Sequence, residues 1–256
     1  MFPKISIIVP TLNQARFIEE TIQSVLTQKY PNLEVIVIDG GSTDNTIEIL
    51  KKYTGSLTWI SEPDKGQVDA INKGLKLVTG EVVAYLNSDD VYTPNALLTV
   101  GKYFSEHPDT QIVTGKCINI DENGVETRAL IKLYKNFWLK LRIDRFLTVL
   151  DYVSQPSTFW RSGLIQSIGL FDDQFRNAMD YDYWLRIIQK HKLGFINKYL
   201  SKFRIYPTSI TSSNSRAQYN DQYRVASRYA SPMELFFHKI HADISCWIYE
   251  NIANRK

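Results

Sequence analysis

The chain has 256 residues, 44% of them hydrophobic and 22% charged, as in a folded globular protein of one large or two small domains. Its formal net charge of +3 is too small to indicate a nucleic-acid-binding protein. Cys117 and Cys246 fit no disulfide, metal or redox spacing, and no apolar signal segment or run of about 20 apolar residues is evident. We therefore expect a cytoplasmic protein with reduced cysteines.

Buried strands alternate with amphipathic helices in the first half of the chain. Short apolar runs predict strands at 5–9, 35–38, 57–60 and 82–86. Apolar residues between them recur at helical spacing, and a fourth helix is expected to begin with Thr93 as its N-cap and Pro94 as its first residue. This order predicts a mostly parallel sheet with right-handed crossovers.

A polar turn follows each predicted strand. The turns are 11–13, 39–43, 62–67 and 87–90. The carboxyl ends of parallel strands meet at one rim, where ligands collect, so Asp39, Asp64 and Asp89 are expected to lie near one another. One such turn is usually only a helix cap, but three at one rim indicate a site. Because divalent cations prefer carboxylate oxygens and bridge phosphates, we expect a site for a metal and a diphosphate.

Two common phosphate-binding motifs are missing from the sequence. No Gly-x-Gly-x-x-Gly follows the first predicted strand, and no Gly-x-x-x-x-Gly-Lys-Ser/Thr occurs. Dinucleotide-dependent dehydrogenases and nucleoside triphosphatases are therefore disfavoured.

Three segments in order resemble the family 2 glycosyltransferases. They are Ile-Ser-Ile-Ile-Val-Pro-Thr-Leu-Asn (5–13), Ile-Asp-Gly-Gly-Ser-Thr-Asp-Asn-Thr (38–46) and Tyr-Leu-Asn-Ser-Asp-Asp (85–90). The resemblance extends to about Ile210 and implies the GT-A fold, a Rossmann-like α/β fold whose mostly parallel central sheet is flanked by helices. It also implies an inverting enzyme that moves a sugar from a nucleotide diphosphate sugar to an acceptor hydroxyl.

The resemblance also implies which residues bind the donor. These are Pro10, Thr11, Asn13, Asp39, Asp64, Lys65, Asp69, Asn87 and Ser88. Asn87 and Asp89 align with the two ends of the family's Asp-x-Asp motif, so Asp89 is expected to bind Mg²⁺ or Mn²⁺. The chain departs from the family where Asn87 replaces the first acid and where Gly40 replaces an acid common after Asp39. The second departure leaves the preference for uridine open.

A second acidic segment, Asp180-Tyr181-Asp182 before Trp184-Leu185-Arg186, begins a predicted helix. Taken alone, Asp180 is more often an N-cap and Asp182 an acid of the first turn. The family, however, carries its catalytic base in an acidic pair before such a helix, which implies Asp180 as the base and Asp182 as the second choice. Tyr206 stands where the family often has a His, and we assign it no metal because a neutral phenol is a poorer ligand.

Residues 130–147 interleave aliphatic and aromatic side chains with lysines and arginines. Such a segment either lies on an anionic membrane surface or packs on the sugar-binding half with its lysines reaching water; packing is slightly favoured. Apolar residues at helical spacing recur from about Ser231. That tail covers the core, forms a dimer contact or meets lipid.

The expected organisation is a GT-A domain at 1–211, with a nucleotide-sugar half (1–115) and an acceptor half (116–211), then a linker and helical tail at 212–256. The predicted activity is that of a hexosyltransferase (EC 2.4) using a UDP-, dTDP- or GDP-sugar and a glycan or lipid-linked glycan acceptor. We expect a role in cell-envelope polysaccharide or glycolipid synthesis, with a peripheral contact with the inner face of the membrane and no nucleic-acid partner. The alternatives are a non-catalytic nucleotide-sugar-binding scaffold and a nucleotidyltransferase, although the triphosphate loop that the latter usually needs is not found.

Overall fold

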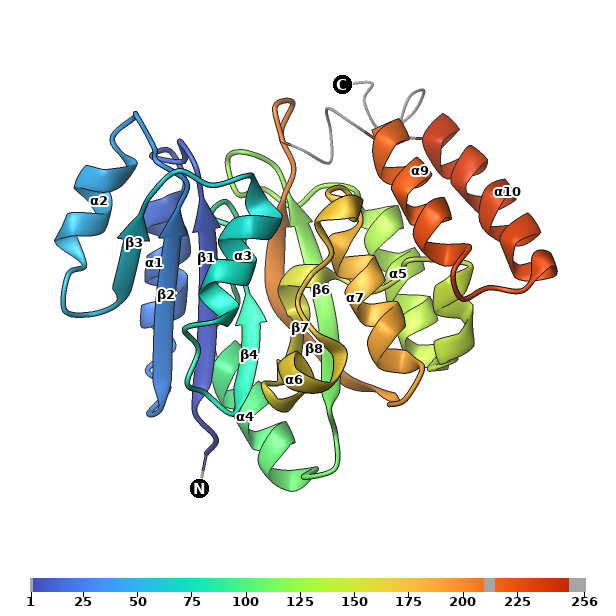
Figure 1. Ribbon diagram of the computed structural model, residues 1–256, viewed down its shortest axis with the longest axis horizontal. Helices are drawn as coiled ribbons and strands as arrows, with labels where there is room; N and C mark the ends of the chain where they lie inside the picture. The colour runs from blue at the N-terminus through green and yellow to red at the C-terminus, as the bar shows by residue number, and fades with distance from the viewer. Residues whose placement is uncertain (1, 210–214, 249–256) are drawn as a thin grey trace. The chain divides into compact units, whose positions relative to one another are not determined.

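The computed structural model describes residues 2–209 and 215–248 (Figure 1). The chain forms two compact units. Unit 1 comprises Met1–Ile118, Ser154–Leu170 and His191–Phe203. Unit 2 comprises Asn119–Val153, Phe171–Lys190 and Arg204–Lys256. Each unit therefore gathers segments that are far apart in the sequence.

An eight-stranded sheet, in the order β3-β2-β1-β4-β7-β6-β8-β5, is the centre of the fold. Its strands are β1 (Ile5–Thr11), β2 (Leu33–Asp39), β3 (Thr58–Ser61), β4 (Val82–Tyr85), β5 (Val91–Tyr92), β6 (Ile112–Ile120), β7 (Thr158–Arg161) and β8 (Leu193–Arg204). The first four strands are parallel, whereas β7 pairs antiparallel with β4 and β6, and β5 pairs antiparallel with β8. The predicted α/β sheet flanked by helices is confirmed, and its parallel part is the part that the strand–helix alternation indicated.

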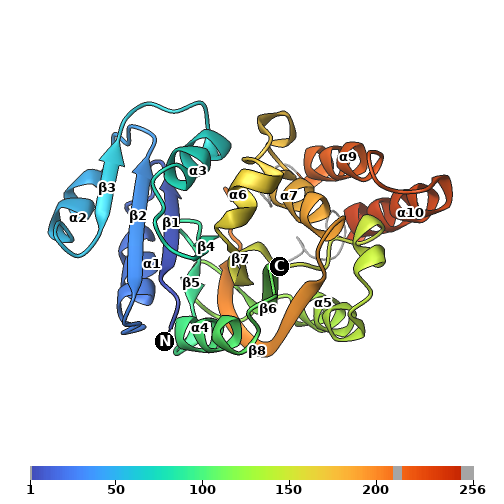
Figure 2. The ribbon, with the colours of Figure 1, turned by 60° about the horizontal axis from the view of Figure 1, so that its bottom comes forward.

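Helices of unit 1 cover both faces of the parallel strands. They are α1 (Ile18–Leu26), α2 (Thr46–Lys52), α3 (Gln67–Leu75), α4 (Ala96–Glu106) and α6 (Gly163–Ile168). Figures 1 and 2 show α3 on one face of the sheet and α1 on the other. The backbone of α3 lies close to β1, because a Cβ at Gly74 would be 2.5 Å from Ile8 Cγ2. Burial on both faces explains why the strands read as continuous apolar runs.

Helix α4 begins two residues later than the sequence predicts. Its N-cap is Asn95, in the left-handed conformation, and its first residue is Ala96. The Thr93 hydroxyl, predicted to cap the helix, instead donates to the Tyr199 carbonyl (2.7 Å). The prediction with Thr93 and Pro94 at the helix start was therefore wrong, because Thr93 serves the adjacent β5–β8 pair.

The carboxyl ends of the parallel strands share one rim, as predicted. Thr11 pairs with Asp39, and Asp39 pairs with Ser61. On the other side of β1, Ile8 pairs with Tyr85 at the end of β4. The turns after β1, β2 and β3 therefore begin at one level, and the turn after β4 begins at the same end of the sheet but opposite the middle of β1.

Unit 2 is mainly helical. Its helices are α5 (Ala129–Leu141), η1 (Asp144–Thr148), η3 (Asp173–Phe175), α7 (Met179–Ile188), α9 (Ser215–Ala226) and α10 (Pro232–Ile248). The sequence predicts a linker at 212–220, and α9 begins within it at Ser215. Residues 212–214 of that linker and the end of the resemblance at 210 lie outside the described residues. No helix in the described ranges has both the length and the hydropathy needed to cross a membrane.

Candidate active site

Asn13 joins the turn after β1 to the turn after β2. Its Oδ1 accepts a hydrogen bond from the Thr43 backbone N–H (2.8 Å), and its own N–H donates to Ser42 Oγ (2.7 Å). Its φ of +52° lies in the left-handed region, which Asn adopts more readily than most residues. Asn13 therefore locks two rim turns together, and its predicted contact with a nucleoside stays a prediction.

Asp39, the last residue of β2, is fully buried among donors of the rim. Its Oδ2 accepts from the Gly41 N–H (3.0 Å), the Ser42 N–H (2.9 Å) and Ser61 Oγ (2.7 Å). Its Oδ1 accepts from Ser42 Oγ (2.5 Å). These bonds occupy both carboxylate oxygens, so Asp39 holds the rim loops in shape. Ser42 and Ser61 had not been predicted as site residues.

Pro10 and Thr11 end β1 and are buried. The Thr11 carbonyl accepts from the Gly40 N–H (2.9 Å), so the strand ladder continues one residue beyond Asp39. Thr11 Oγ1 is buried and has no hydrogen-bond partner among the described residues. Their side chains thus underlie the rim, and donor contact by either residue stays a prediction.

Gly40 lies against the carboxylate of Asp64. A Cβ at position 40 would be 2.5 Å from Asp64 Oδ2, closer than real Cβ atoms come to other heavy atoms. The Gly66 N–H holds Asp64 in place by donating to its Oδ1 (2.8 Å). The acid that the family often carries after Asp39 is thus replaced in space by Asp64, from the loop after β3.

Lys65 and Asp69 lie at the start of α3. The Lys65 backbone N–H donates to Asp69 Oδ2 (3.1 Å), and Lys73 Nζ lies 3.6 Å from the same oxygen. The hydrogen bond from Lys65, helped by the charge of Lys73, lowers the pKa of Asp69 below its ordinary value. Asp69 therefore fixes the first turn of α3, and the Lys65 side chain is exposed at the rim.

The Asn87 amide joins three segments at the end of β4. Its Oδ1 accepts from Gln67 Nε2 (2.6 Å) on α3. Its Nδ2 faces Asp90 Oδ2 (3.3 Å) and Gln155 Oε1 (3.4 Å), the latter in η2 (Gln155–Ser157). Because Asp90 is fully buried, an Asp at position 87 would place two carboxylates side by side. The amide donor explains why this chain has Asn at the first position of the motif.

Gln67 and Asp90 lie in the turns predicted to share the rim but were not named as site residues, and Gln155 was missed altogether. Gln155 also donates from Nε2 to the Tyr85 carbonyl at the end of β4 (2.7 Å). Its partners lie far from it along the chain, so sequence spacing offered no signal. Taken alone, the Gln-Pro-Ser-Thr segment (155–158) predicts only an irregular entry to a short strand.

Ser88 and Asp89 complete the turn after β4. Ser88 is buried and Asp89 is partly exposed. Within the described residues, no three His, Cys, Asp or Glu side chains are placed to hold a metal ion. Mg²⁺ usually takes only one or two protein carboxylates and completes its shell with phosphate oxygens and water. A partly exposed carboxylate such as Asp89 fits that arrangement, and its metal role stays a prediction.

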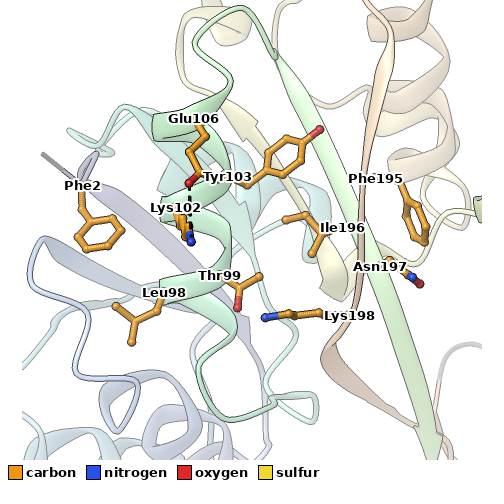
Figure 3. Close-up of a pocket in the computed structure, with 10 residues that line it drawn as sticks. All are labelled: Phe2, Leu98, Thr99, Lys102, Tyr103, Glu106, Phe195, Ile196, Asn197 and Lys198. Carbon is orange, nitrogen blue, oxygen red and sulfur yellow. Dashed lines mark ion pairs between the residues drawn. The ribbon is translucent and has the colours of Figure 1, made fainter.

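A pocket of about 620 Å³ lies elsewhere on unit 1, between α4 and β8 (Figure 3). Phe2, before the start of β1, and Lys102, on α4, are among the residues that line it. Phe2 precedes the amino end of β1, whereas the polar rim lies at its carboxyl end. The Lys102–Glu106 ion pair is exposed, and none of the predicted site residues lines this pocket. We therefore do not assign it to the donor.

In unit 2, α7 carries the two predicted candidates for the base in different surroundings. The helix has Ala178 at its N-cap, so Asp180 lies in the first turn and is not the capping residue. Asp180 is partly exposed, and burial raises its pKa although the Tyr181 N–H and Lys135 oppose the shift. Asp182 is fully buried and pairs with Arg186 Nε (2.9 Å). Asp180 is thus the more available acid.

Asp151 is an acidic neighbour of Asp180 that sequence reasoning missed. Its Oδ2 accepts from Gln222 Nε2 (3.1 Å), and its Oδ1 is buried without a hydrogen-bond partner among the described residues. Burial raises the pKa of Asp151, Lys135 opposes the rise, and the charge of Asp180 adds to it. Two neighbouring acids that each have few hydrogen-bond donors form a group that can hold and release a proton.

Arg204 is the last residue of β8 and Tyr206 follows two residues later; both belong to unit 2. Arg204 is buried, and its Nη1 lies 3.3 Å from the carbonyls of Asp121 and Glu122. It is therefore neither a surface charge nor an exposed phosphate ligand. The Tyr206 carbonyl accepts from the N–H (3.0 Å) and the hydroxyl (2.8 Å) of Ser209, and its phenol carries no assigned role.

Comparison with known families gives a match to Glycosyl transferase family 2 over residues 6–167. The chain belongs to glycosyl transferase family 2. The family 2 resemblance predicted from the rim motifs and the predicted glycosyltransferase class, EC 2.4, are therefore confirmed. The match includes the rim turns of unit 1 and ends before α7.

Curated relatives of this glycosyltransferase carry the same class of name. An uncharacterized glycosyltransferase of Rickettsia prowazekii (strain Madrid E) is 26% identical over 257 residues, covering 97% of this chain and 81% of that protein. A PGL/p-HBAD biosynthesis glycosyltransferase of Mycobacterium bovis (strain BCG / Pasteur 1173P2) is 30% identical over 189 residues, covering 72% of this chain and 69% of that protein.

Solved structures of similar shape support the GT-A-like fold. S. aureus TarS 1-349 in complex with UDP-GlcNAc aligns with a TM-score of 0.69 and 21% identity, covering 97% of this chain and 73% of that one. The mannosyltransferase PcManGT from Pyrobaculum calidifontis, in complex with GDP-Man and Mn²⁺, aligns with a TM-score of 0.70 and 20% identity, covering 99% and 71%. The present chain spans 44% of the longer TarS chain, which is also 21% identical. At such low identity the likeness shows the fold alone.

Proposed function

We propose that this glycosyltransferase transfers a sugar, with inversion, from a nucleotide diphosphate sugar bound at the rim of unit 1. The observation that carries the proposal is the interlocked rim, in which Asn13 and Asp39 fix the turns after β1 and β2. From the loop after β3, Asp64 brings a carboxylate and Lys65 an exposed ammonium group to the same rim. Such a rim suits a ligand with both hydroxyl groups and phosphates.

The donor belongs to the nucleotide-sugar class. Structural neighbours in complex with UDP-GlcNAc, UDP and GDP-Man support this class but do not indicate which nucleobase the donor carries. The donors in this proposal are UDP-, dTDP- or GDP-sugars. The Asp64 carboxylate beside Gly40 is the group that we expect to face the nucleobase or the ribose of the donor.

Asp89 is the proposed ligand of Mg²⁺ or Mn²⁺. The neighbour with GDP-Man and Mn²⁺ supports a divalent ion in this fold. When bound, the ion supplies positive charge that stabilises the leaving diphosphate. Asn87 brings no charge to the ion, because its amide is neutral, and that amide is already engaged by Gln67, Asp90 and Gln155.

Asp180 is the proposed general base. An acceptor hydroxyl gives its proton to the Asp180 carboxylate while its oxygen forms a bond to the anomeric carbon and the bond from that carbon to the diphosphate breaks. The raised pKa of Asp180 suits this step, because a carboxylate with a higher pKa is a stronger base. General-base help of this kind is worth about 10²–10⁴-fold in rate.

The acceptor in this proposal is a glycan or lipid-linked glycan of cell-envelope polysaccharide or glycolipid synthesis. A lipid-linked acceptor would be presented at a membrane, so we also propose that the enzyme works in the cytoplasm at the inner face of the membrane, as a peripheral protein. Exposed apolar side chains of unit 2 support this contact.

Thermal unfolding with UDP, GDP, dTDP or CDP, each with and without Mn²⁺, tests the donor site. A ligand at 100 times its dissociation constant stabilises the native state by about 2.7 kcal/mol, which gives a measurable rise in Tm. We expect one nucleotide to raise Tm in a metal-dependent way, and Asp89→Asn to abolish the metal dependence. Asp173→Asn, at an exposed acid in unit 2, is the control. The absence of a shift with all four nucleotides would contradict the donor site and favour a scaffold.

A further inference from the structure

Helix α5 presents an exposed apolar stripe. Its members are at least 40% exposed and recur at spacings of three and four residues: Leu130, Leu133, Tyr134, Phe137 and Leu141. At about 100° per residue they cover a narrow arc of the helix, while Asn136 and Leu139, on the opposite side, are buried. Soluble helices normally turn such a stripe toward a core.

Helix α10 presents a second stripe with the same spacing. Its members are also at least 40% exposed: Met233, Phe236, Phe237, Ile240, Ile244 and Trp247. The same helix packs on unit 2 through a different side, where His238 is buried and its Nδ1 lies 3.1 Å from the Thr148 carbonyl. The stripe is therefore additional to the side that holds α10 in place.

The two stripes lie on one face of unit 2. Tyr134 contacts His241 (Oη to Nε2, 2.9 Å), whereas Arg145, beyond the C-terminal end of α5, pairs with Glu234 at the start of α10 (2.5 Å). These contacts make the helices antiparallel. Viewed down each helix from its amino end, the contacting residue (Tyr134 or His241) is rotated in the same direction from the centre of the stripe. When two helices run antiparallel, this places both stripes on the same face of the pair.

Basic residues accompany this apolar face. Segments 129–148 and 232–248 together contain six Lys and Arg residues and three Asp and Glu residues. Lys140, Arg142 and Lys239 are exposed, and the first two lie at the end of α5 next to its stripe. Exposed Phe and Trp side chains beside Lys and Arg are typical of protein surfaces that enter the interfacial layer of a bilayer.

We propose that the two stripes form a docking surface for an anionic lipid bilayer. The inference rests on the membrane contact proposed above and names the surface that makes it. The apolar side chains enter the boundary between headgroups and acyl chains, while Lys140, Arg142 and Lys239 meet anionic headgroups. A second copy of the chain fits the face less well, because an isologous contact would bring the basic residues of both copies together.

Sedimentation of the full chain with vesicles tests the proposal. The vesicles are phosphatidylcholine alone and an equimolar mixture of phosphatidylcholine and phosphatidylglycerol, each at low and high salt. We expect stronger binding to the anionic vesicles and weaker binding at high salt, because Lys and Arg contribute through screened electrostatics. Lack of binding to either vesicle would overturn the proposal.

Paired variants locate the surface. Phe137→Ser with Phe236→Ser removes one ring from each stripe and should lower the vesicle partition coefficient at least about tenfold. Lys140→Gln with Arg142→Gln should lower it about tenfold on anionic vesicles and leave neutral vesicles unaffected. Leu77→Ser with Val125→Ser, at exposed apolar residues outside both stripes, is the matched control and should bind as the parent does.

Two further measurements separate the possible outcomes. Nucleotide-dependent Tm shifts are recorded for every variant; they report the donor site and the folded state, so loss of vesicle binding with intact shifts concerns the docking surface alone. Sedimentation velocity without vesicles detects a second copy. A dimer that the Phe variants dissociate, in a chain that binds no vesicles, would overturn the lipid assignment in favour of self-association.

Discussion

Acids of the two units have contrasting surroundings. In unit 1, Asp39 is buried but accepts hydrogen bonds from two backbone N–H groups and two hydroxyls. In unit 2, Asp151 and Asp180 lie near each other with few donors, and burial raises the pKa of both. A carboxylate surrounded by donors holds the loops that supply them, whereas one with few donors can exchange a proton. The contrast separates acids that build the rim from the acid that we propose as the base.

Asp180→Asn tests that contrast with the largest expected effect. The variant should lose about 10²–10⁴-fold in the transfer rate, because the amide cannot take the proton of the acceptor. Its Tm should be equal to or above the parent value, since Asn can still accept from the Tyr181 N–H and removes a charge disfavoured by burial. Transfer kinetics at saturating donor, with Tm measured in parallel, check both expectations.

Asp182→Asn is the matched control, two residues along the same helix. Asp182 faces Arg186, and burial raises its pKa despite that partner. We expect this variant to keep transfer within about tenfold of the parent, because Asp182 is occupied by its ion pair. Loss of transfer in Asp182→Asn with retention in Asp180→Asn would move the base to Asp182. Retention in both would remove the base from this helix.

Asp39→Asn tests the other side of the contrast, with an intermediate effect. The amide would turn an NH₂ group toward one or more of the rim donors, so we expect a loss of about 2 kcal/mol in the free energy of unfolding. Ser61→Ala removes one donor and leaves the carboxylate, and it should cost less. Denaturant unfolding of both variants measures the difference. Equal stability of Asp39→Asn and the parent would show that these hydrogen bonds do not hold the rim.

The rim could be predicted from sequence because each strand and the polar turn after it are adjacent in the chain. A buried run followed by a polar turn recurs four times, and parallel pairing then places Asn13, Asp39, Asp64 and Asp89 at the ends of neighbouring strands. The amide at position 87 could not be explained in advance. Its Nδ2 faces two acceptors: Asp90, in the same turn, and Gln155, which lies 68 residues later and is brought to position 87 only by folding.

Asp151, the acidic neighbour of the predicted base Asp180, lay beyond sequence reasoning for the same reason. Gln222 reaches Asp151 across 71 residues of chain, and neither residue belongs to a motif. The segment at 130–147 shows another limit. Its amphipathic spacing predicted a helix, but spacing does not say which face is covered: Asn136 and Leu139 are buried, whereas Leu130 and Phe137 are exposed. The choice between packing and a membrane surface stays a prediction. Which face of a helix is buried depends on residues that are distant from it in the chain.

Glu34, at the start of β2, is another acid of unit 1 that is surrounded by donors, and its substitution gives the smallest expected effect. Its contribution to stability depends on pH. It accepts from Lys4 Nζ (2.8 Å), Ser6 Oγ (2.5 Å) and the Thr79 N–H (2.8 Å). Burial alone would raise its pKa, but these hydrogen bonds outweigh burial and lower the pKa from 4.5 to about 2. The unfolded chain therefore binds a proton at a higher pH than the native state does. The stabilisation is complete above about pH 4.5 and is lost as pH falls toward 2.

Glu34→Gln should therefore lower the free energy of unfolding by about 1 kcal/mol at neutral pH, a value reduced for the solvent that reaches this pair. The parent and the variant should converge as the pH approaches 2, because the native Glu34 is then half protonated. Denaturant midpoints measured between neutral pH and pH 2 check this. A difference that stays constant across that range would mean that the variant acts through packing and not through the charge. Asp180→Asn should show the opposite sign, since its raised pKa makes the ionised acid the less stable form in the native state.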